Sequence, residues 1–373
     1  MAQQFDSPKT ETQLREIQDK LYQHSKEVYN AGDRPAFKGL LEIMSAEATI
    51  VTAIHNIKSN HGSETPGVDF KTTRRDYLEK PYQWVIKDIQ SAFKHFEVQK
   101  IRRKYIDKPG KAEKRPLGIP TIRDRIVQEC MKIVLEPILE GQFFEHSYGF
   151  RPMRDTAMAL ARINQISHSS AKYWIVEGDI SKCFDNIDHG ILLKRLYHIG
   201  IRDRRVKYRD IYVGFTALAF CKWEMTAIKA QAETPYSEEG RQRYFKRTKK
   251  KRMNARLNEM YSESTTRAVC YSTWGKLNNF EFIMNRAYAL NRDRLKCRVC
   301  GGWLISAAPC AHRVNPYLPL NQVNRVNNLV SMHRKCLDAV NNPNQDISEF
   351  DAEAQKKIKG FRDKLVTSHT RNK

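Results

Sequence analysis

The chain has 373 residues, 40% hydrophobic and 29% charged, a balance ordinary for a soluble globular protein with room for two or three domains. Lys and Arg number 65 against 42 Asp and Glu, and the net charge of +23 favours a polyanionic partner, nucleic acid first, with a solvated basic surface as the alternative. No apolar run approaches the roughly 18 residues of a membrane span and the N-terminus has no apolar signal core, so we expect no membrane partner and a cytoplasmic location.

The first half of the chain predicts helices joined by short loops. Their ranges are 11–30, 36–57, 74–96 and 153–168. Residues 100–120 contain two short extended pieces on either side of a Pro-Gly pair, which indicates a β-hairpin. The stretch that follows has Asp124 near its start and apolar residues at helical spacing. These are Ile126, Val127, Cys130, Ile133, Val134, Pro137 and Ile138.

The composition of the sequence changes after about residue 205. Residues 205–223 read as one or two strands, and residues 222–262 are dominated by charge, with the basic run KRTKKKR at 246–252. A helix is expected over about 275–293, followed by a compact Cys/His segment over 295–342. The charged tail, 350–373, predicts a solvated or frayed helix.

A hydrophobic strand over 173–179 ends in Asp179 and turns towards a helix. Template-directed phosphoryl transfer uses two magnesium ions bridged by carboxylates, and Asp179 can supply one of these. The partner that such a site needs, a turn with paired aspartates, is missing, because the sequence contains no Asp-Asp dipeptide. The alternative role for Asp179 is structural, as a cap of the helix that follows.

Four motifs occur in an order that is specific to one family: TPGVD (65–69), RPLGIPTIRDRIVQE (115–129), HSYGFRP (146–152) and GDISKCFDNIDH (178–189). They resemble the fingers and early palm of group II intron reverse transcriptase/maturases. The block over 235–252 and the C-terminal Cys/His segment resemble the tail of the same family. The resemblance implies a mixed α/β (α+β) chain, with partial right-hand polymerase fingers and palm and a small ββα-metal-like zinc module.

The elements that the family has between these two halves are not found. There is no PQG-type loop, no YADD-like turn and no recognisable thumb, and the nearest tetrapeptide to the turn is Tyr208-Arg209-Asp210-Ile211. An internal deletion with its junction near Arg205 explains this pattern. We therefore expect the chain to be inactive as a polymerase.

The resemblance also assigns roles to individual residues. Asp179 matches the first catalytic, magnesium-binding Asp, and Phe184 matches the side chain that excludes a ribose 2′-OH. Arg102, Lys108 and Arg115, on the expected hairpin, match finger residues that bind the nucleotide triphosphate, where charge-assisted hydrogen bonds fix geometry.

Two pairs of sulfur and nitrogen ligands predict a structural zinc site. Cys297 and Cys300 form one pair, and His333 and Cys336 form the other. Such ligands suit a closed tetrahedral zinc site, from which a small segment gains much of its folding energy. The alternative is a reduced Cys pair and a surface His. The other cysteines are scattered, which argues against a disulfide framework.

The residues between these pairs resemble the HNH nuclease pattern. His312 matches the first His, a catalytic-metal ligand, and Asn328 matches the central Asn. The general-base position holds Arg313, which stays protonated and cannot activate water. The position of a later metal-ligating His falls on Leu337, and Asn341 is a weak substitute ligand. The nuclease centre is therefore expected to be damaged in two places.

Basic patches at 102–104, 202–205 and 246–252 are of the kind that binds phosphate backbones. We hypothesise an intron-RNA-binding remnant linked to splicing and intron mobility, with group II intron RNA as partner and target DNA as a possible second one. The alternatives are an HNH-type DNA endonuclease and a decayed reading frame. The expected parts are 1–205, reverse transcriptase fingers and partial palm; 206–275, a basic connecting segment; 276–345, the HNH-type zinc module; and 346–373, a charged tail.

Overall fold

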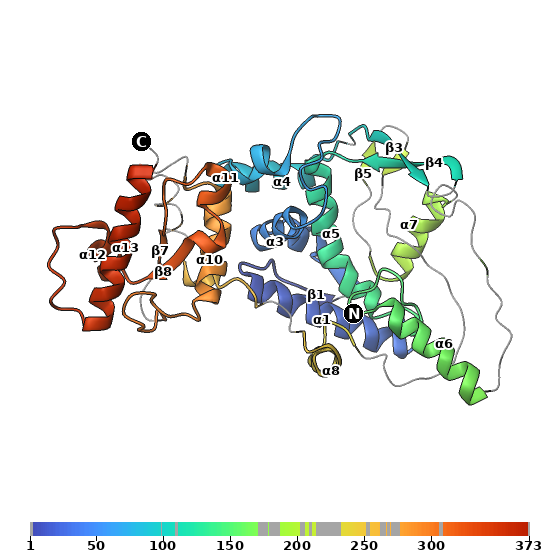
Figure 1. Ribbon diagram of the computed structural model, residues 1–373. Coiled ribbons are helices and arrows are strands. Elements are labelled where there is room, and N and C mark those ends of the chain that lie inside the picture. The colour runs from blue at the N-terminus through green and yellow to red at the C-terminus, as the bar shows by residue number, and fades with distance from the viewer. Residues whose placement is uncertain are drawn as a thin grey trace. The chain divides into compact units, whose positions relative to one another are not determined.

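The computed structural model divides the chain into two compact units built from interleaved segments (Figure 1). The first unit contains residues 1–7, 15–44 and 132–253, and the second contains residues 8–14, 45–131 and 254–373. The described residues are 3–97, 99–108, 111–170, 178, 187–201, 206–208, 211–213, 233–250, 254–261, 266, 269, 277–305 and 309–371. None of the helices in these ranges is both long and apolar enough to cross a membrane.

The first unit is largely helical. Its elements are β1 (Gln3–Gln4), α1 (Glu11–Asn30) from residue 15 onward, β2 (Phe37–Lys38), α2 (Leu40–Met44), the second half of α5 (Ile122–Glu140), α6 (Thr156–Ser170), α7 (His189–His198), β5 (Val206–Tyr208), β6 (Ile211–Val213) and α8 (Glu238–Thr248). The strands β1 and β2 pair in parallel, and β5 and β6 pair antiparallel. The predicted helices over 11–30 and 153–168 are therefore confirmed. Apart from residue 178, the expected strand over 173–179 lies outside the described residues.

The helix after residue 121 is confirmed as α5, and its burial follows the predicted spacing. All seven of the predicted apolar residues are buried, including Pro137 inside the helix. Two polar side chains of α1 are buried against it, Gln18 and Ser25, which donate to the carbonyls of Ile133 and Ile138 at 2.9 and 2.7 Å. These bonds satisfy the buried polar groups, so α1 packs on α5 without unpaired donors at those positions.

The second unit combines two distant parts of the sequence. Its elements are α3 (Glu47–Lys58), the π-helix η1 (Arg74–Leu78), α4 (Tyr82–Lys94), β3 (Arg102–Lys108), β4 (Lys111–Ile119), the first half of α5, η3 (Asn258–Met260), α10 (Phe280–Arg292), β7 (Cys310–Arg313), α11 (Leu320–Val323), η4 (Val326–Asn328), β8 (Leu329–Met332), α12 (Arg334–Asn341) and α13 (Ala352–Arg371). The antiparallel pair β3–β4 confirms the predicted hairpin, and β7–β8 is also antiparallel.

Two helices predicted as continuous are divided in the structure. The stretch 74–96 forms η1 and then α4, because Pro81 has no backbone N–H to continue the first helix and instead stands just before the second. The stretch 36–57 forms β2, α2 and α3, with a break at Ser45 and Ala46. Neither break disturbs the apolar spacing from which the helices were predicted, which is why spacing alone did not reveal them.

The helix α10 joins the two parts of the second unit. Every residue from Phe280 to Leu290 is buried, including Glu281. Phe280 stacks on Tyr82 of α4 with ring centroids 5.3 Å apart, and Tyr288 lies 4.4 Å from the ring of His55 in α3. The segment with the TPGVD motif and the Cys/His segment therefore share one hydrophobic core.

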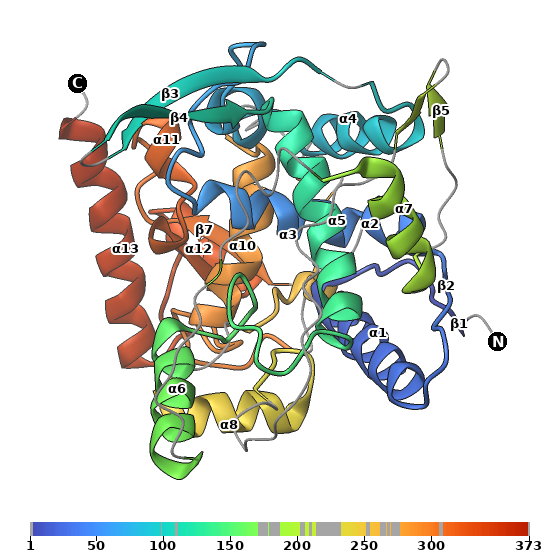
Figure 2. The same cartoon turned by 90° about the vertical axis from the view of Figure 1, so that its right-hand side faces the viewer.

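The tail helix α13 runs alongside α12 and β7 (Figures 1 and 2). A helix over the tail is confirmed, but it is not solvated on all sides. Ala354 and Ile358, one turn apart, are 1% and 0% exposed in the core of the Cys/His segment. Phe361 and Leu365 continue the same stripe at the edge of that core. The many charges of the tail occupy the other faces of the helix and conceal this apolar stripe.

Candidate functional site

The four predicted zinc ligands come together in the second unit. Cys297 and Cys300 follow α10, His333 stands at the N-terminus of α12, and Cys336 lies in its first turn. Their ligand atoms all lie within 4.8 Å of one another. A tetrahedral zinc ion with Zn–S bonds of about 2.3 Å needs sulfur atoms about 3.8 Å apart, so the four groups need only a small closure around such an ion. A Cys₃His set can therefore hold a metal ion here.

The ring of His333 is oriented for ligation. Its Nε2 lies 3.1 Å from the carbonyl oxygen of Trp303, and its Nδ1 lies 3.3 Å from Sγ of Cys300. A proton on Nε2, donated to that carbonyl, leaves the Nδ1 lone pair directed at the cluster, which is the usual arrangement for a ligating histidine.

The thiols of Cys297 and Cys336 are hydrogen-bonded to each other. The Cys336 thiol donates to the sulfur of Cys297 and, together with backbone amides, lowers the pKa of Cys297 to about 4. The same hydrogen bond raises the pKa of Cys336. A cluster that already stabilises one thiolate suits a cation, because metal ligation requires deprotonated sulfur. Within the described ranges, no other group of three or more His, Cys, Asp or Glu residues has this geometry.

The HNH-like residues lie on the β7–β8 pair, which α12 follows. His312 pairs in register with Val330, and Arg313 with Leu329. His312 is 6% exposed and contacts Phe361 of α13 edge to face, at 6.0 Å between ring centroids. Burial, and then the charge of Arg313, lower the pKa of His312 to about 4, so its ring is neutral at pH 7. Its Nε2 is buried without a hydrogen-bond partner.

Arg313 is held by several fixed contacts. Its guanidinium donates to Oδ1 of Asn324 at 2.9 Å, and to the carbonyl of Leu277 and Oδ1 of Asn278, both at 2.8 Å. It also lies over the ring of Phe282, 4.0 Å from the centroid. Burial lowers the pKa of Arg313 to about 10, so it is still protonated at pH 7. The residue at the general-base position thus clamps β7 to the start of α10.

The remaining HNH-like positions have structural surroundings. Asn328 closes the loop before β8, because it donates to the carbonyls of Asn315 and Val323 and accepts from the amide of Asn315. Asn341 is exposed at the end of α12, and Leu337 packs at the edge of the core. Asn328 therefore fixes the loop before β8.

The predicted nucleotide-binding residues are only partly described. Asp179 and Phe184 lie outside the described residues. On the hairpin, Arg115 is in register with Ile106, and Lys108 with Lys111 across a bulge. Arg102 donates to the carbonyl of Pro66 at 3.2 Å and so ties the hairpin to the TPGVD loop.

Two motif arginines have roles that the sequence did not reveal. Arg125 donates to the carbonyls of Gly62, Thr65 and Pro120 and fixes the TPGVD loop. In that loop a Cβ on Gly67 would lie 2.7 Å from Cα of Thr121, so only glycine fits.

In the first unit, Arg151 of HSYGFRP forms two hydrogen bonds to the Glu140 carboxylate, at 2.9 and 2.8 Å, and both side chains are at most 5% exposed. It also donates to the carbonyls of Phe144 and Ser147. The motif gave the signal that these arginines are special, but their partners lie too far along the chain to be paired from sequence.

One arginine of the basic run at 246–252 forms ion pairs within the first unit. Arg247 pairs with Glu233 at 2.9 Å and with Asp155 at 3.2 Å. Arg241, in the preceding turn of α8, binds Asp19 of α1 at 2.9 Å. These two arginines anchor α8 to its own unit, while Lys246, Lys249 and Lys250 remain exposed to solvent.

Comparison with known proteins supports the family resemblance. The family described as "Reverse transcriptase (RNA-dependent DNA polymerase)" matches residues 106–236. The group II intron-encoded protein LtrA of Lactococcus lactis subsp. cremoris is 36% identical over 166 residues, which are 44% of this chain and 27% of that protein. Protein YkfC of Escherichia coli (strain K12) is 36% identical over 160 residues, 42% of this chain and 41% of that protein.

A third relative is nuclear intron maturase 2, mitochondrial, of Arabidopsis thaliana, which is 40% identical over 85 residues, 22% of this chain and 11% of that protein. The matched region thus spans less than half the length of each of these relatives. Residues 106–236 define a reverse transcriptase segment. The chain is therefore similar, over this segment, to group II intron-encoded proteins and intron maturases.

Proposed function

We propose that this chain binds group II intron RNA and that it does not polymerise DNA by itself. The observation that carries the proposal is the reverse transcriptase match over 106–236, which reaches relatives named as intron-encoded proteins and maturases while the sequence contains no Asp-Asp dipeptide. The net charge of +23 supports an RNA partner. This RNA binding would serve splicing and intron mobility.

The expected loss of polymerase chemistry rests on a count of carboxylates. Two magnesium ions need several carboxylate oxygens to hold them at a fixed separation. Asp179 supplies one carboxylate, and the tetrapeptide Tyr208-Arg209-Asp210-Ile211 supplies at most one more. We therefore propose that Asp179, together with Phe184, Arg102, Lys108 and Arg115, now serves the fold or RNA contact rather than nucleotide incorporation.

We propose that the Cys₃His cluster holds a structural zinc ion. Its four protein ligands leave no open position for water or substrate, as in a structural site. DNA cleavage by the HNH-like residues is not part of the proposal. His312 is buried against Phe361, and the protonated Arg313 is bound to three acceptors, so neither is placed to activate water.

The RNA-binding proposal is tested by filter binding with the RNA of the intron that surrounds the reading frame. A scrambled RNA of equal length is the matched control. Tighter binding to the intron RNA is the expected result, and equal affinity for the two RNAs would overturn the proposal. Primer extension on an RNA template with Mg²⁺, and with an active reverse transcriptase as positive control, should give no product. A product that disappears in Asp179→Ala would disprove the loss of polymerase activity.

A further inference from the structure

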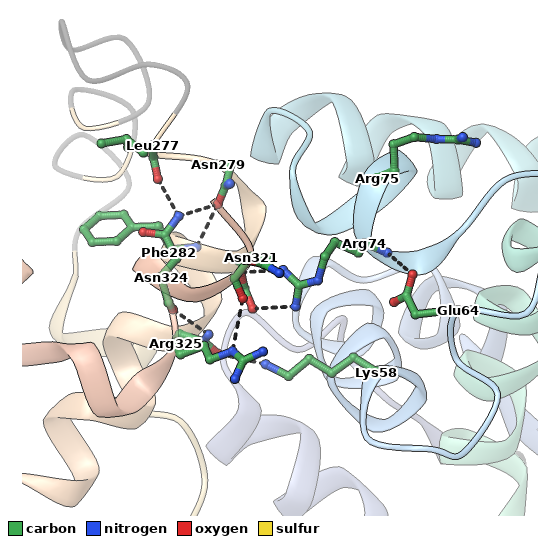
Figure 3. Close-up of polar contacts among 12 residues, drawn as sticks. Lys58, Glu64, Arg74, Arg75, Leu277, Asn279, Phe282, Asn321, Asn324 and Arg325 are labelled. Carbon is green, nitrogen blue, oxygen red and sulfur yellow. Dashed lines mark hydrogen bonds and ion pairs between the residues drawn. The ribbon is translucent and has the colours of Figure 1, made fainter. Parts of the chain in front are cut away.

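Three basic side chains from distant parts of the sequence, those of Lys58, Arg74 and Arg325, lie near one another in the second unit (Figure 3). Lys58 is the last residue of α3, and Arg74 is the first residue of η1. Arg325 lies between α11 and η4, in the Cys/His segment. The cluster therefore includes both parts of the second unit, which α10 joins through the shared core.

A buried carboxylate beside the cluster, that of Glu281, is already paired. Its two oxygens accept from the guanidinium of Arg74 at 3.2 and 3.5 Å, and Glu281 is only 2% exposed. The exposed carboxylate of Glu64 accepts from the backbone amide of Arg74. Arg75, which pairs with Asp76, points away from the cluster (Figure 3). Arg74 therefore occupies both oxygens of Glu281, which among the described residues is the carboxylate that acts most strongly on Lys58.

A hydrogen-bonded frame holds the other two cations in place. The Lys58 ammonium donates to Oδ1 of Asn285 at 3.1 Å, and the amide of Asn285 donates to the carbonyl of Asn324 at 2.8 Å. Arg325 follows Asn324 directly, and its Nε donates to the carbonyl of Asn321. The Lys58 ammonium has two further N–H donors, and Arg325 has the donors on its terminal nitrogens, Nη1 and Nη2.

The electrostatic surroundings of Lys58 are unfavourable for a cation. Burial lowers its pKa, Arg74, Arg325 and Arg256 lower it further, and Glu281 alone among the strongest influences raises it. Arg256 is paired with Glu11 at 2.8 Å and Arg74 with Glu281 at 3.2 Å, so the unbalanced positive charge beside Lys58 comes from Arg325. An anion placed between Lys58 and Arg325 would relieve this repulsion, and phosphate suits a lysine and an arginine fork together.

We propose that Lys58 and Arg325, with Arg74 beside them, bind a phosphate group of a nucleic-acid backbone. The site rests on the proposed function, which supplies the nucleic acid, and deepens it by assigning a contact that the two distant sequence segments make jointly. A backbone phosphate fits better than an enclosed free anion, because Arg325 is exposed and the cluster opens to solvent. Such a contact positions a strand and reads no base, so it acts on any RNA sequence.

The test compares the salt dependence of RNA binding between variants. The full chain carrying Lys58→Gln and Arg325→Gln together is titrated against a fluorescent single-stranded RNA of mixed sequence, from about 50 to about 200 mM KCl. Losing one phosphate contact should reduce the slope of log K against log salt by about 0.7, so the affinity of the unaltered protein should fall about 2.6-fold more than that of the variant over this range. Gln at position 58 can still donate to Asn285.

The matched control is Lys359→Gln, which removes one charge from an exposed position on α13. It should leave the slope nearly unchanged, and Arg325→Lys should keep the slope of the unaltered protein. Equal thermal unfolding of all variants guards against misfolding. The proposal is overturned if the double variant and Lys359→Gln have the same slope, or if the double substitution abolishes calorimetric binding of inorganic phosphate without changing RNA binding. Because the RNA is of mixed sequence, equal binding to intron and scrambled RNA would overturn the proposed function and leave this result intact.

Discussion

Replacing Cys336 by Ala should unfold the Cys/His segment, because it removes one of four ligands from a closed site. Structural zinc contributes on the order of 10–16 kcal/mol to folding in zinc-finger peptides, whereas a whole domain is stable by about 5–15 kcal/mol. Cys336 is 3% exposed and belongs to the same buried core as Leu304, Val330 and Met332. The loss should therefore be a collapse of this core rather than a small shift in melting temperature.

The control for this prediction is Cys310→Ala. Cys310 is a half-buried thiol on β7 that does not belong to the cluster, and its truncation should cost about 1 kcal/mol. Metal content is measured by mass spectrometry, and unfolding by circular dichroism with and without a chelator. We expect one zinc per chain in the unaltered protein and in Cys310→Ala, and none in Cys336→Ala. The reasoning is refuted if the purified protein holds no metal, or if Cys336→Ala and Cys310→Ala unfold at the same temperature.

Three further predictions concern single side chains. His312 in the folded chain takes up a proton only near pH 4, against about 6.5 when unfolded, so its contribution to stability is present above pH 6.5 and is lost as the pH falls towards 4. Between pH 7 and pH 5, urea unfolding should therefore show that His312→Phe loses about 2 kcal/mol less of its free energy of unfolding than the unaltered protein loses. An equal loss in the two proteins would contradict this. Arg313→His should cost about 2–4 kcal/mol, because three acceptors lose their donor, and should not nick supercoiled plasmid with Mg²⁺ or Mn²⁺; nicking would restore the nuclease interpretation. Arg151→Ala, which leaves the Glu140 carboxylate buried, should cost about 3–5 kcal/mol by denaturant titration, and adding Glu140→Gln should recover part of that loss.

Spacing along the sequence predicted those parts of the fold that depend on one face of one element. The seven apolar residues of α5 are all buried because a helix repeats its core face every three to four residues. The same signal cannot locate a break that preserves the spacing, as at Pro81. It also fails where charge surrounds a narrow apolar stripe, as with Ala354 and Ile358 in the tail.

The candidate sites also differ in whether the sequence could predict them. The Cys₃His cluster was predictable because each pair of ligands is local and the chemistry of sulfur and imidazole is distinctive. The pairing of Arg151 with Glu140 and the gathering of Lys58 with Arg325 were not predictable, because arginine and lysine are common and their partners are set by tertiary packing. HSYGFRP marked Arg151 as part of a motif without indicating that its role is to bind α5.

An internal deletion that removes the central strands of the palm is expected to leave exposed sheet edges and poor packing. In the second unit, however, α10 packs Phe280 on Tyr82 and Tyr288 beside His55, so the C-terminal segment completes a core with the N-terminal one. The second unit therefore builds this core without the intervening residues 132–253. Its nucleic-acid contacts would then be made jointly by both segments, as the placement of Lys58 and Arg325 already suggests.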